Sequence, residues 1–185
     1  MMQRLDPRRF GLVCAATALV TGVMVAGCGE RIEGAPTPNT AEVTSYRAAA
    51  SSSSAAATSS QIAADRQQAI TDNCNQFMTT SGNGVSKYNE FVDAHDNDAP
   101  DYDAKRDAAV TAMNDAADQV EGRANGAGAN LPEDLKTKLL AYVDAARALA
   151  QATGTMTYTA PVGPLNDAGQ VVNDARNAVI DSCPG

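Results

Sequence analysis

The sequence predicts an all-α protein whose folded part is an antiparallel up-down four-helix bundle. Alanine, the strongest helix former, is abundant, and β-branched residues are sparse outside the N-terminal segment. Four separate segments carry apolar residues at intervals of three and four, which is the spacing of amphipathic helices. The connections between these segments are modest in length, and such connections favour antiparallel neighbours.

Composition and charge narrow the classes of ligand. Aromatic residues make up only 4% of the chain and tryptophan is absent, so a deep aromatic-lined pocket is not expected. The formal net charge is -8. An acidic protein repels phosphate backbones and anionic lipid headgroups, which argues against nucleic acid as a partner and against electrostatic docking on a membrane.

Residues 1–27 are predicted to be a lipoprotein signal peptide. Arg4, Arg8 and Arg9 precede an uncharged apolar stretch that runs from Phe10 to Val25. A charged start followed by an apolar run is the pattern of a secretory signal. The run of about sixteen residues is shorter than the roughly 20 apolar residues that a membrane-spanning helix needs.

The apolar run ends in Val25-Ala26-Gly27-Cys28. These residues resemble the bacterial lipobox, in which small residues precede a cysteine that receives a diacylglyceryl group before a peptidase cuts on its N-terminal side. The resemblance implies that Cys28 is lipidated and that its acyl chains hold the mature protein on a membrane. The alternative is an uncleaved anchor helix with an incidental cysteine.

Residues 28–60 are predicted to be a flexible tether. From Gly29 to about Ser60 the chain is dominated by Ser, Ala, Thr and Pro, with too few large apolar side chains to bury a core. Alanine runs at 48–50 and 55–57 favour helix, so a helix through Tyr46 is an alternative for this segment. Its Ser and Thr residues could also accept O-linked sugar.

Residues 61–185 are predicted to form the bundle, and the first helix is expected from about 62 to 96. Its apolar residues keep the same helical spacing before and after Gly82-Asn83-Gly84, whereas a loop at this point would interrupt that spacing. The two glycines cost about 1 kcal/mol each relative to alanine. The stripe comprises Ile70, Cys74, Phe77, Met78, Ser81, Val85, Tyr88, Val92 and His95.

Three further helices follow in the sequence. The second begins after Pro100 and ends in a glycine-rich stretch at 122–128. The third opens at Asn130-Leu131-Pro132-Glu133, where an N-cap side chain and a glutamate three residues later could form a capping box. The fourth follows a Thr-, Gly- and Pro-rich loop at 153–164, and its inner face is Leu165, Ala168, Val172, Ala175 and Val179.

Cys74 and Cys183 are predicted to form one disulfide. Cys14 leaves with the signal peptide and Cys28 is consumed by lipidation, so these two cysteines remain in the mature chain. Export places them in a compartment that permits oxidation. An up-down bundle brings the start of its first helix and the end of its last helix to the same end, which allows the pairing.

An acidic segment, Asp93 to Asp103, is the only concentration of possible metal ligands. Asp96 and Asp98 could take the first and third positions of a calcium loop. Asp101 and Asp107 then stand where the turn glycine and the closing glutamate are needed. We therefore interpret the segment as a solvated loop that caps the second helix, whose dipole favours acidic residues at its start.

No catalytic or cofactor motif is found. His95 is the only histidine, so zinc has no second imidazole, and we predict neither a metal site nor a cofactor. The sequence contains no G-x-S-x-G, S-x-x-K, H-E-x-x-H or Walker motif. The protein is not expected to be an enzyme.

The lipobox, the Ser/Ala/Pro tether and the helical domain with two cysteines together resemble the small alanine-rich envelope lipoproteins of mycobacteria and related actinobacteria, which mostly lack an assigned role. The resemblance implies a place on the extracytoplasmic face of the cell membrane, held by lipid on Cys28. The predicted function is a non-enzymatic module that binds an envelope protein or a wall component through a helix face or the 153–164 loop. The alternative is an envelope carrier of a hydrophobic ligand or a metal ion, which would need an internal cavity or convergence of Asp96, Asp98 and His95.

Overall fold

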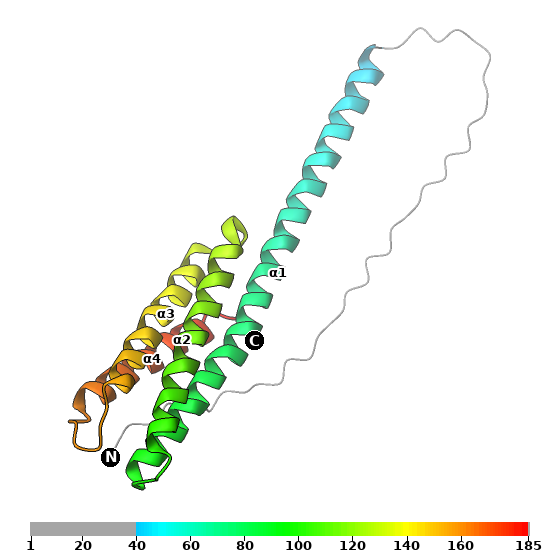
Figure 1. The fold of residues 1–185 in the computed structure, drawn as a ribbon. Helices are drawn as coiled ribbons and strands as arrows, with labels where there is room; N and C mark the ends of the chain where they lie inside the picture. The colour runs from blue at the N-terminus through cyan, green and yellow to red at the C-terminus, as the bar shows by residue number, and fades with distance from the viewer. Residues whose placement is uncertain (1–39, 185) are drawn as a thin grey trace. The chain divides into compact units, whose positions relative to one another are not determined.

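The structure is a computed structural model and describes residues 40–184. Its elements are α1 (Thr40–Asp96), α2 (Tyr102–Gly126), one turn of 3-10 helix η1 (Gly128–Asn130), α3 (Glu133–Gly154) and α4 (Gly163–Ile180) (Figure 1). The described chain contains no strand, and the predicted four-helix bundle is confirmed. None of these helices has the length and apolar content needed to cross a bilayer. The predicted signal peptide and Cys28 lie outside the described residues.

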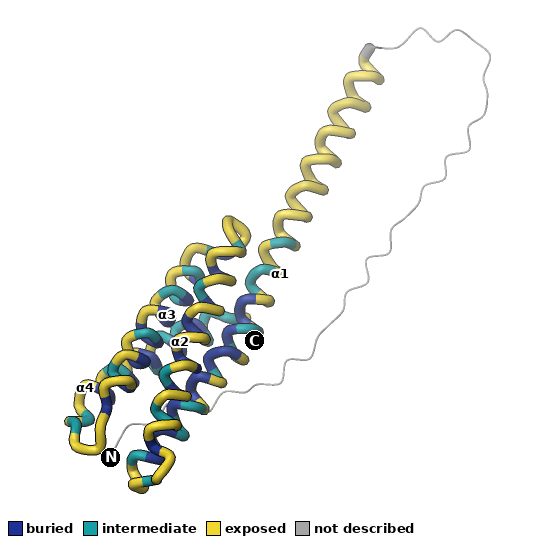
Figure 2. The backbone as a smooth tube through the Cα atoms, viewed as in Figure 1, coloured by how far each residue is buried: buried dark blue, intermediate teal, exposed yellow. Residues whose placement is uncertain are grey.

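α1 is longer than predicted. It begins at Thr40, so the coil expected over residues 40–60 is wrong and the helical alternative is correct there. No glycine or proline interrupts the sequence between residues 40 and 81, and alanine supplies helix propensity. The serine hydroxyls bond back to carbonyls within the helix, as in Ser51 to Arg47 at 2.9 Å. Because residues 41–61 are all exposed, this stretch is helical without tertiary packing (Figure 2).

α1 and α4 run antiparallel and pair at seven-residue intervals. The pairs are Cys74 with Cys183, Ser81 with Arg176, and Tyr88 with Gly169. Each step of seven forward in α1 corresponds to a step of seven backward along α4, counted from Cys183 just after its end. Seven is the repeat at which helices pack side chains into one another's holes. We call this line of contacts the α1–α4 seam.

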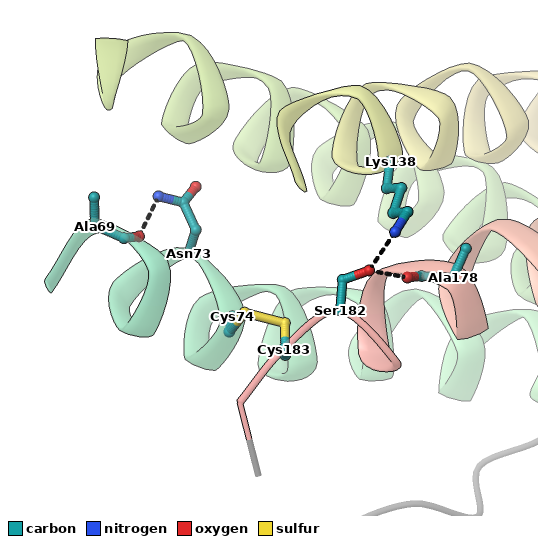
Figure 3. The surroundings of a disulfide bond; sticks show 7 residues. All are labelled: Ala69, Asn73, Cys74, Lys138, Ala178, Ser182 and Cys183. Atoms are coloured by element: carbon teal, nitrogen blue, oxygen red, sulfur yellow. Dashed lines mark hydrogen bonds between the residues drawn. A yellow bond between two sulfur atoms is a disulfide. The ribbon is translucent and has the colours of Figure 1, made fainter. Parts of the chain in front are cut away.

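Cys74 and Cys183 form the predicted disulfide at one end of this seam (Figure 3). Their Cα atoms are 5.8 Å apart, within the limit of about 7 Å for a bridge that needs no backbone movement. Lys138 of α3 donates a hydrogen bond of 2.7 Å to Ser182, the residue before Cys183. Three of the four helices are therefore connected at this end of the bundle.

The core combines a few large side chains with many alanines, and it lies on the faces that the helices turn toward one another (Figure 2). The small residues allow close helix approach. A Cβ added at Gly84 of α1 would lie 3.3 Å from Met113 Sδ and 3.7 Å from the Ala112 carbonyl of α2. The largest fully buried side chains are Tyr88, Tyr142, Phe77, Phe91, Met113, Leu139, Leu149 and Leu165.

The start of α3 differs from the predicted capping box. Asn130 ends the 3-10 turn, Leu131 is extended, and Pro132 occupies the N-cap without a side-chain hydrogen bond. Because α3 begins only at Glu133, Asn130 lies too far upstream to cap it. Glu133 and Asp134 instead lie in the first turn, where their charges complement the helix dipole.

Candidate functional site

The connection between α1 and α2 meets the connection between α3 and α4 at one end of the bundle. The Tyr158 hydroxyl donates a hydrogen bond of 2.8 Å to the Ala99 carbonyl oxygen. The Tyr158 ring stacks on Tyr102 with 4.2 Å between ring centroids. We call residues 95–103 and 155–162 together the loop end.

The backbone at the end of α1 presents the carbonyl that Tyr158 contacts. Asp98 has a φ of 50°, a left-handed conformation that aspartate tolerates better than most residues. The Ala99 amide donates to the Ala94 carbonyl at 2.9 Å, and the Asp98 amide donates to the His95 carbonyl at 3.3 Å. These two bonds form a Schellman cap that ends α1 and fixes the turn.

His95 lies beside the two stacked tyrosines. Its ring centroid is 5.8 Å from those of both Tyr102 and Tyr158, and its Nδ1 lies 3.4 Å from Asp96 Oδ1. Its Nε2 is buried without a hydrogen-bond partner. The histidine therefore serves as one wall of an aromatic cluster that supports Tyr158.

Carboxylates surround the Tyr158 hydroxyl. Its pKa is raised by desolvation and then by the charges of Asp98, Asp103 and Asp101, so the hydroxyl stays protonated and donates at neutral pH. Arg106 pairs with Asp103 at 2.8 Å. Asp98 and Asp101 form no ion pair within residues 40–184. The loop end therefore combines a positioned tyrosine with a cluster of carboxylates, of which Asp101 also interacts with the charge of Lys105.

The predicted cap of α2 is correct in position but not in its bonding. Asp101 occupies the N-cap, yet its side chain makes no capping hydrogen bond. Asp103 lies in the first turn, where its charge complements the helix dipole. The acidic segment thus acts on α2 through charge and leaves its carboxylates toward solvent.

The metal alternative depended on convergence of His95, Asp96 and Asp98. The structure places His95 beside Asp96, but no group of three or more His, Cys, Asp or Glu side chains in residues 40–184 could hold a metal ion. Sequence reasoning singled out the 153–164 loop and the acidic segment separately and did not predict their contact. The one available signal was a lone aromatic residue, Tyr158, in a polar loop.

Replacing Tyr158 with phenylalanine is expected to loosen the 155–162 loop without unfolding the bundle. Phenylalanine keeps the stacked ring but loses the bond to Ala99, which is worth about 0.5 to 1.5 kcal/mol. Tyr158→Ala loses both contacts. Amide hydrogen exchange over the loop should rise from the wild type to Tyr158→Phe and again to Tyr158→Ala, while Tyr46→Phe leaves it unchanged. Equal exchange in all four proteins would show that other contacts hold the loop.

Comparison with known proteins identifies a family. Residues 55–184 match the family described as the Rv2240c four-helix bundle domain. No curated protein and no solved structure matches the chain. The match covers more than half of the sequence and includes all four helices wholly or in part.

Proposed function

Because the chain belongs to the Rv2240c four-helix bundle domain family, a family with a mycobacterial name, we propose that it is an envelope lipoprotein of the kind its N-terminus resembles. Lipid on Cys28 would hold it on the extracytoplasmic face of the cell membrane. The Val25-Ala26-Gly27-Cys28 sequence supports this proposal. The disulfide also supports it, because such bonds persist mainly in exported proteins.

We further propose that the bundle is a non-enzymatic interaction module that binds a basic partner, an envelope protein or a wall component, through the loop end. The observation that carries this proposal is the state of Tyr158. Its side chain is held by a hydrogen bond and a ring stack, yet 45% of the residue remains exposed. A rigid exposed tyrosine supplies contact area at little cost in conformational entropy, and tyrosine is enriched at binding hot spots.

The negative charge of the loop end favours a positively charged partner. Asp98 and Asp101 would attract Lys or Arg side chains, and a cation could also lie over the exposed face of the Tyr158 ring. The net charge of the whole chain, -8, would also attract a basic partner as the two molecules approach each other. The alternative, a carrier of a hydrophobic ligand, has less support, because the groove between α1 and α4 is lined mostly by polar and charged residues.

Substitution of Cys28 tests the anchor. Cys28→Ala is expected to move the protein from the membrane fraction to the soluble extracytoplasmic fraction, because no acyl chain can then be attached. Cell fractionation and mass spectrometry of the mature N-terminus measure this change. Cys14→Ala is the matched control and should remain lipidated. A Cys28→Ala protein that stays fully membrane-bound would contradict lipid anchoring at this residue.

Site-specific photo-crosslinking in intact cells tests the interaction surface. A photoreactive residue at position 158 is expected to crosslink a basic protein or wall fragment, and the same residue at the exposed position Asn114 on α2 is the control. Combining it with Asp98→Asn and Asp101→Asn should reduce the crosslink at least several-fold, because the attraction for cations is lost. Equal crosslinking at both positions, or none at 158, would exclude the loop end as the binding surface.

A further inference from the structure

The dipeptide Asn-Gly occurs twice in the sequence, as Asn83-Gly84 in α1 and as Asn125-Gly126 at the end of α2. This dipeptide is chemically labile, because glycine has no Cβ to shield its backbone nitrogen from the asparagine side chain. Both asparagines are exposed, and neither side chain makes a hydrogen bond within residues 40–184. The difference between the two sites lies in the backbone of the glycine.

The backbone at Gly84 is held inside the bundle. Gly84 is buried in the middle of α1, and a Cβ added there would lie 3.3 Å from Met113 Sδ and 3.7 Å from the Ala112 carbonyl oxygen of α2. For its nitrogen to turn toward the Asn83 side chain, α1 would have to break at its centre and separate from α2. We expect this opening to cost a free energy comparable to that of unfolding the bundle.

The backbone at Gly126 lies at the surface, in the last turn of α2. Gly126 is exposed, and a Cβ added there would meet no atom within 4 Å. Two residues later, Gly128 has a φ of 57°, so the chain leaves the path of α2 here. Helix ends fray at a small cost in free energy. The Gly126 nitrogen can therefore leave its helical position while the rest of the bundle stays folded.

We propose that Asn125 is a site of spontaneous deamidation. The Gly126 nitrogen attacks the side-chain carbonyl carbon Cγ of Asn125, and the Cγ–Nδ2 bond breaks. The proton of the attacking nitrogen passes to the departing amide, which leaves as ammonia. Water then opens the cyclic imide at either carbonyl and leaves aspartate or isoaspartate. This inference concerns the end of α2 alone and does not depend on the lipid anchor or on the loop end.

The new carboxylate would weaken the end of α2. A negative charge at the C-terminal end of a helix opposes the helix dipole. Gly126, next to Asn125, also lines a surface groove together with Asp65 and Asp72 of α1, which would repel the new charge. Isoaspartate in addition inserts one carbon atom into the backbone, which disturbs the spacing of the helical hydrogen bonds. We therefore expect faster amide hydrogen exchange over residues 123–130 in the deamidated protein.

Incubation of the full chain at mildly alkaline pH tests this proposal, because base removes the proton of the attacking nitrogen. Peptide mapping by mass spectrometry measures deamidation at each asparagine. In the folded protein Asn125 should react at least about tenfold faster than Asn83, since a difference of about 1.4 kcal/mol in the cost of local opening gives this factor. In denaturant both should react at similar rates, because they share the same dipeptide.

Two alanine variants separate the reaction from the stability of the helix. Gly126→Ala shields the attacking nitrogen and should slow deamidation of Asn125 at least several-fold. Gly122→Ala, one turn earlier, adds the same methyl group in equally open space and leaves the dipeptide intact, so the reaction should continue. Alanine favours helix at both positions, so both variants should fold. Equal rates at Asn83 and Asn125 in the folded protein, reaction at Asn125 only in denaturant, or equal rates in the two variants would overturn the proposal.

Discussion

Removal of the Cys74–Cys183 disulfide is expected to lower the free energy of unfolding by about 2 to 5 kcal/mol. The bridge spans a sequence separation of 109 residues, so it removes much conformational freedom from the unfolded chain. The alanine-rich core supplies little apolar area per side chain to compensate. The double variant Cys74→Ala, Cys183→Ala, measured by chemical and thermal unfolding, tests this expectation.

Ser182→Ala is the matched control for the disulfide. Ser182 accepts a bond from Lys138 and donates one of 2.8 Å to the Ala178 carbonyl, at the same end of the bundle (Figure 3). These bonds are partly exposed, so their loss should cost only about 1 kcal/mol. If the double cysteine variant is no less stable than Ser182→Ala, the fold does not depend on the bridge.

Alkaline pH is expected to unfold the bundle through two buried tyrosines. Burial raises the pKa of Tyr142 to about 12 and raises that of Tyr88 as well. The unfolded chain therefore releases these protons at lower pH than the folded chain. Their contribution to stability is complete below about pH 10 and is lost as the pH rises through 12, at about 1.4 kcal/mol per pH unit for each tyrosine. Circular dichroism and tyrosinate absorbance, followed together from neutral to alkaline pH, should change in one cooperative step.

Phenylalanine substitutions provide the control for the alkaline transition. The hydroxyls of Tyr88 and Tyr142 are buried without hydrogen-bond partners. Tyr142→Phe should therefore cost little at neutral pH and make the decline in stability at high pH shallower. Tyr46→Phe, at a residue that is 77% exposed, should change neither. If the stability of Tyr142→Phe falls with rising pH as steeply as that of the wild type, ionisation of this hydroxyl does not cause the loss of stability at alkaline pH.

The helices of the bundle could be predicted because their signal is local and periodic. The apolar stripe through Phe77, Tyr88 and Val92 indicated that α1 continues as one helix across its two central glycines. Antiparallel topology then placed Cys74 and Cys183 at the same end of the bundle. The start of α1 could not be predicted in the same way. Residues 40–60 have no apolar stripe, so only alanine propensity and the absence of glycine and proline favoured helix there.

The candidate sites depend on contacts that the sequence does not encode locally. Tyr158 meets Ala99 across 59 residues, and no periodic pattern connects two polar loops. Arg176 lies on the buried stripe of α4 between Val172 and Val179, where the sequence pattern had placed Ala175, and a charged residue is rarely buried so fully. Its burial follows from the spacing of the α1–α4 seam, which exists only once both helices are packed.

The position of the disulfide determines how mechanical load passes through the molecule. α1 is one uninterrupted helix, and Cys74 precedes Phe77, Tyr88 and Phe91, the large core side chains of α1. A pull on the N-terminal side of α1 therefore reaches the covalent bond to Cys183, just after α4, before it reaches the packing of these side chains. The bridge holds α1 in register along the seam, so that sliding by one heptad would require rupture of a covalent bond. Resistance to forced unfolding is governed by the rate of unfolding. The disulfide raises the activation barrier to unfolding at the point where the force first reaches the bundle.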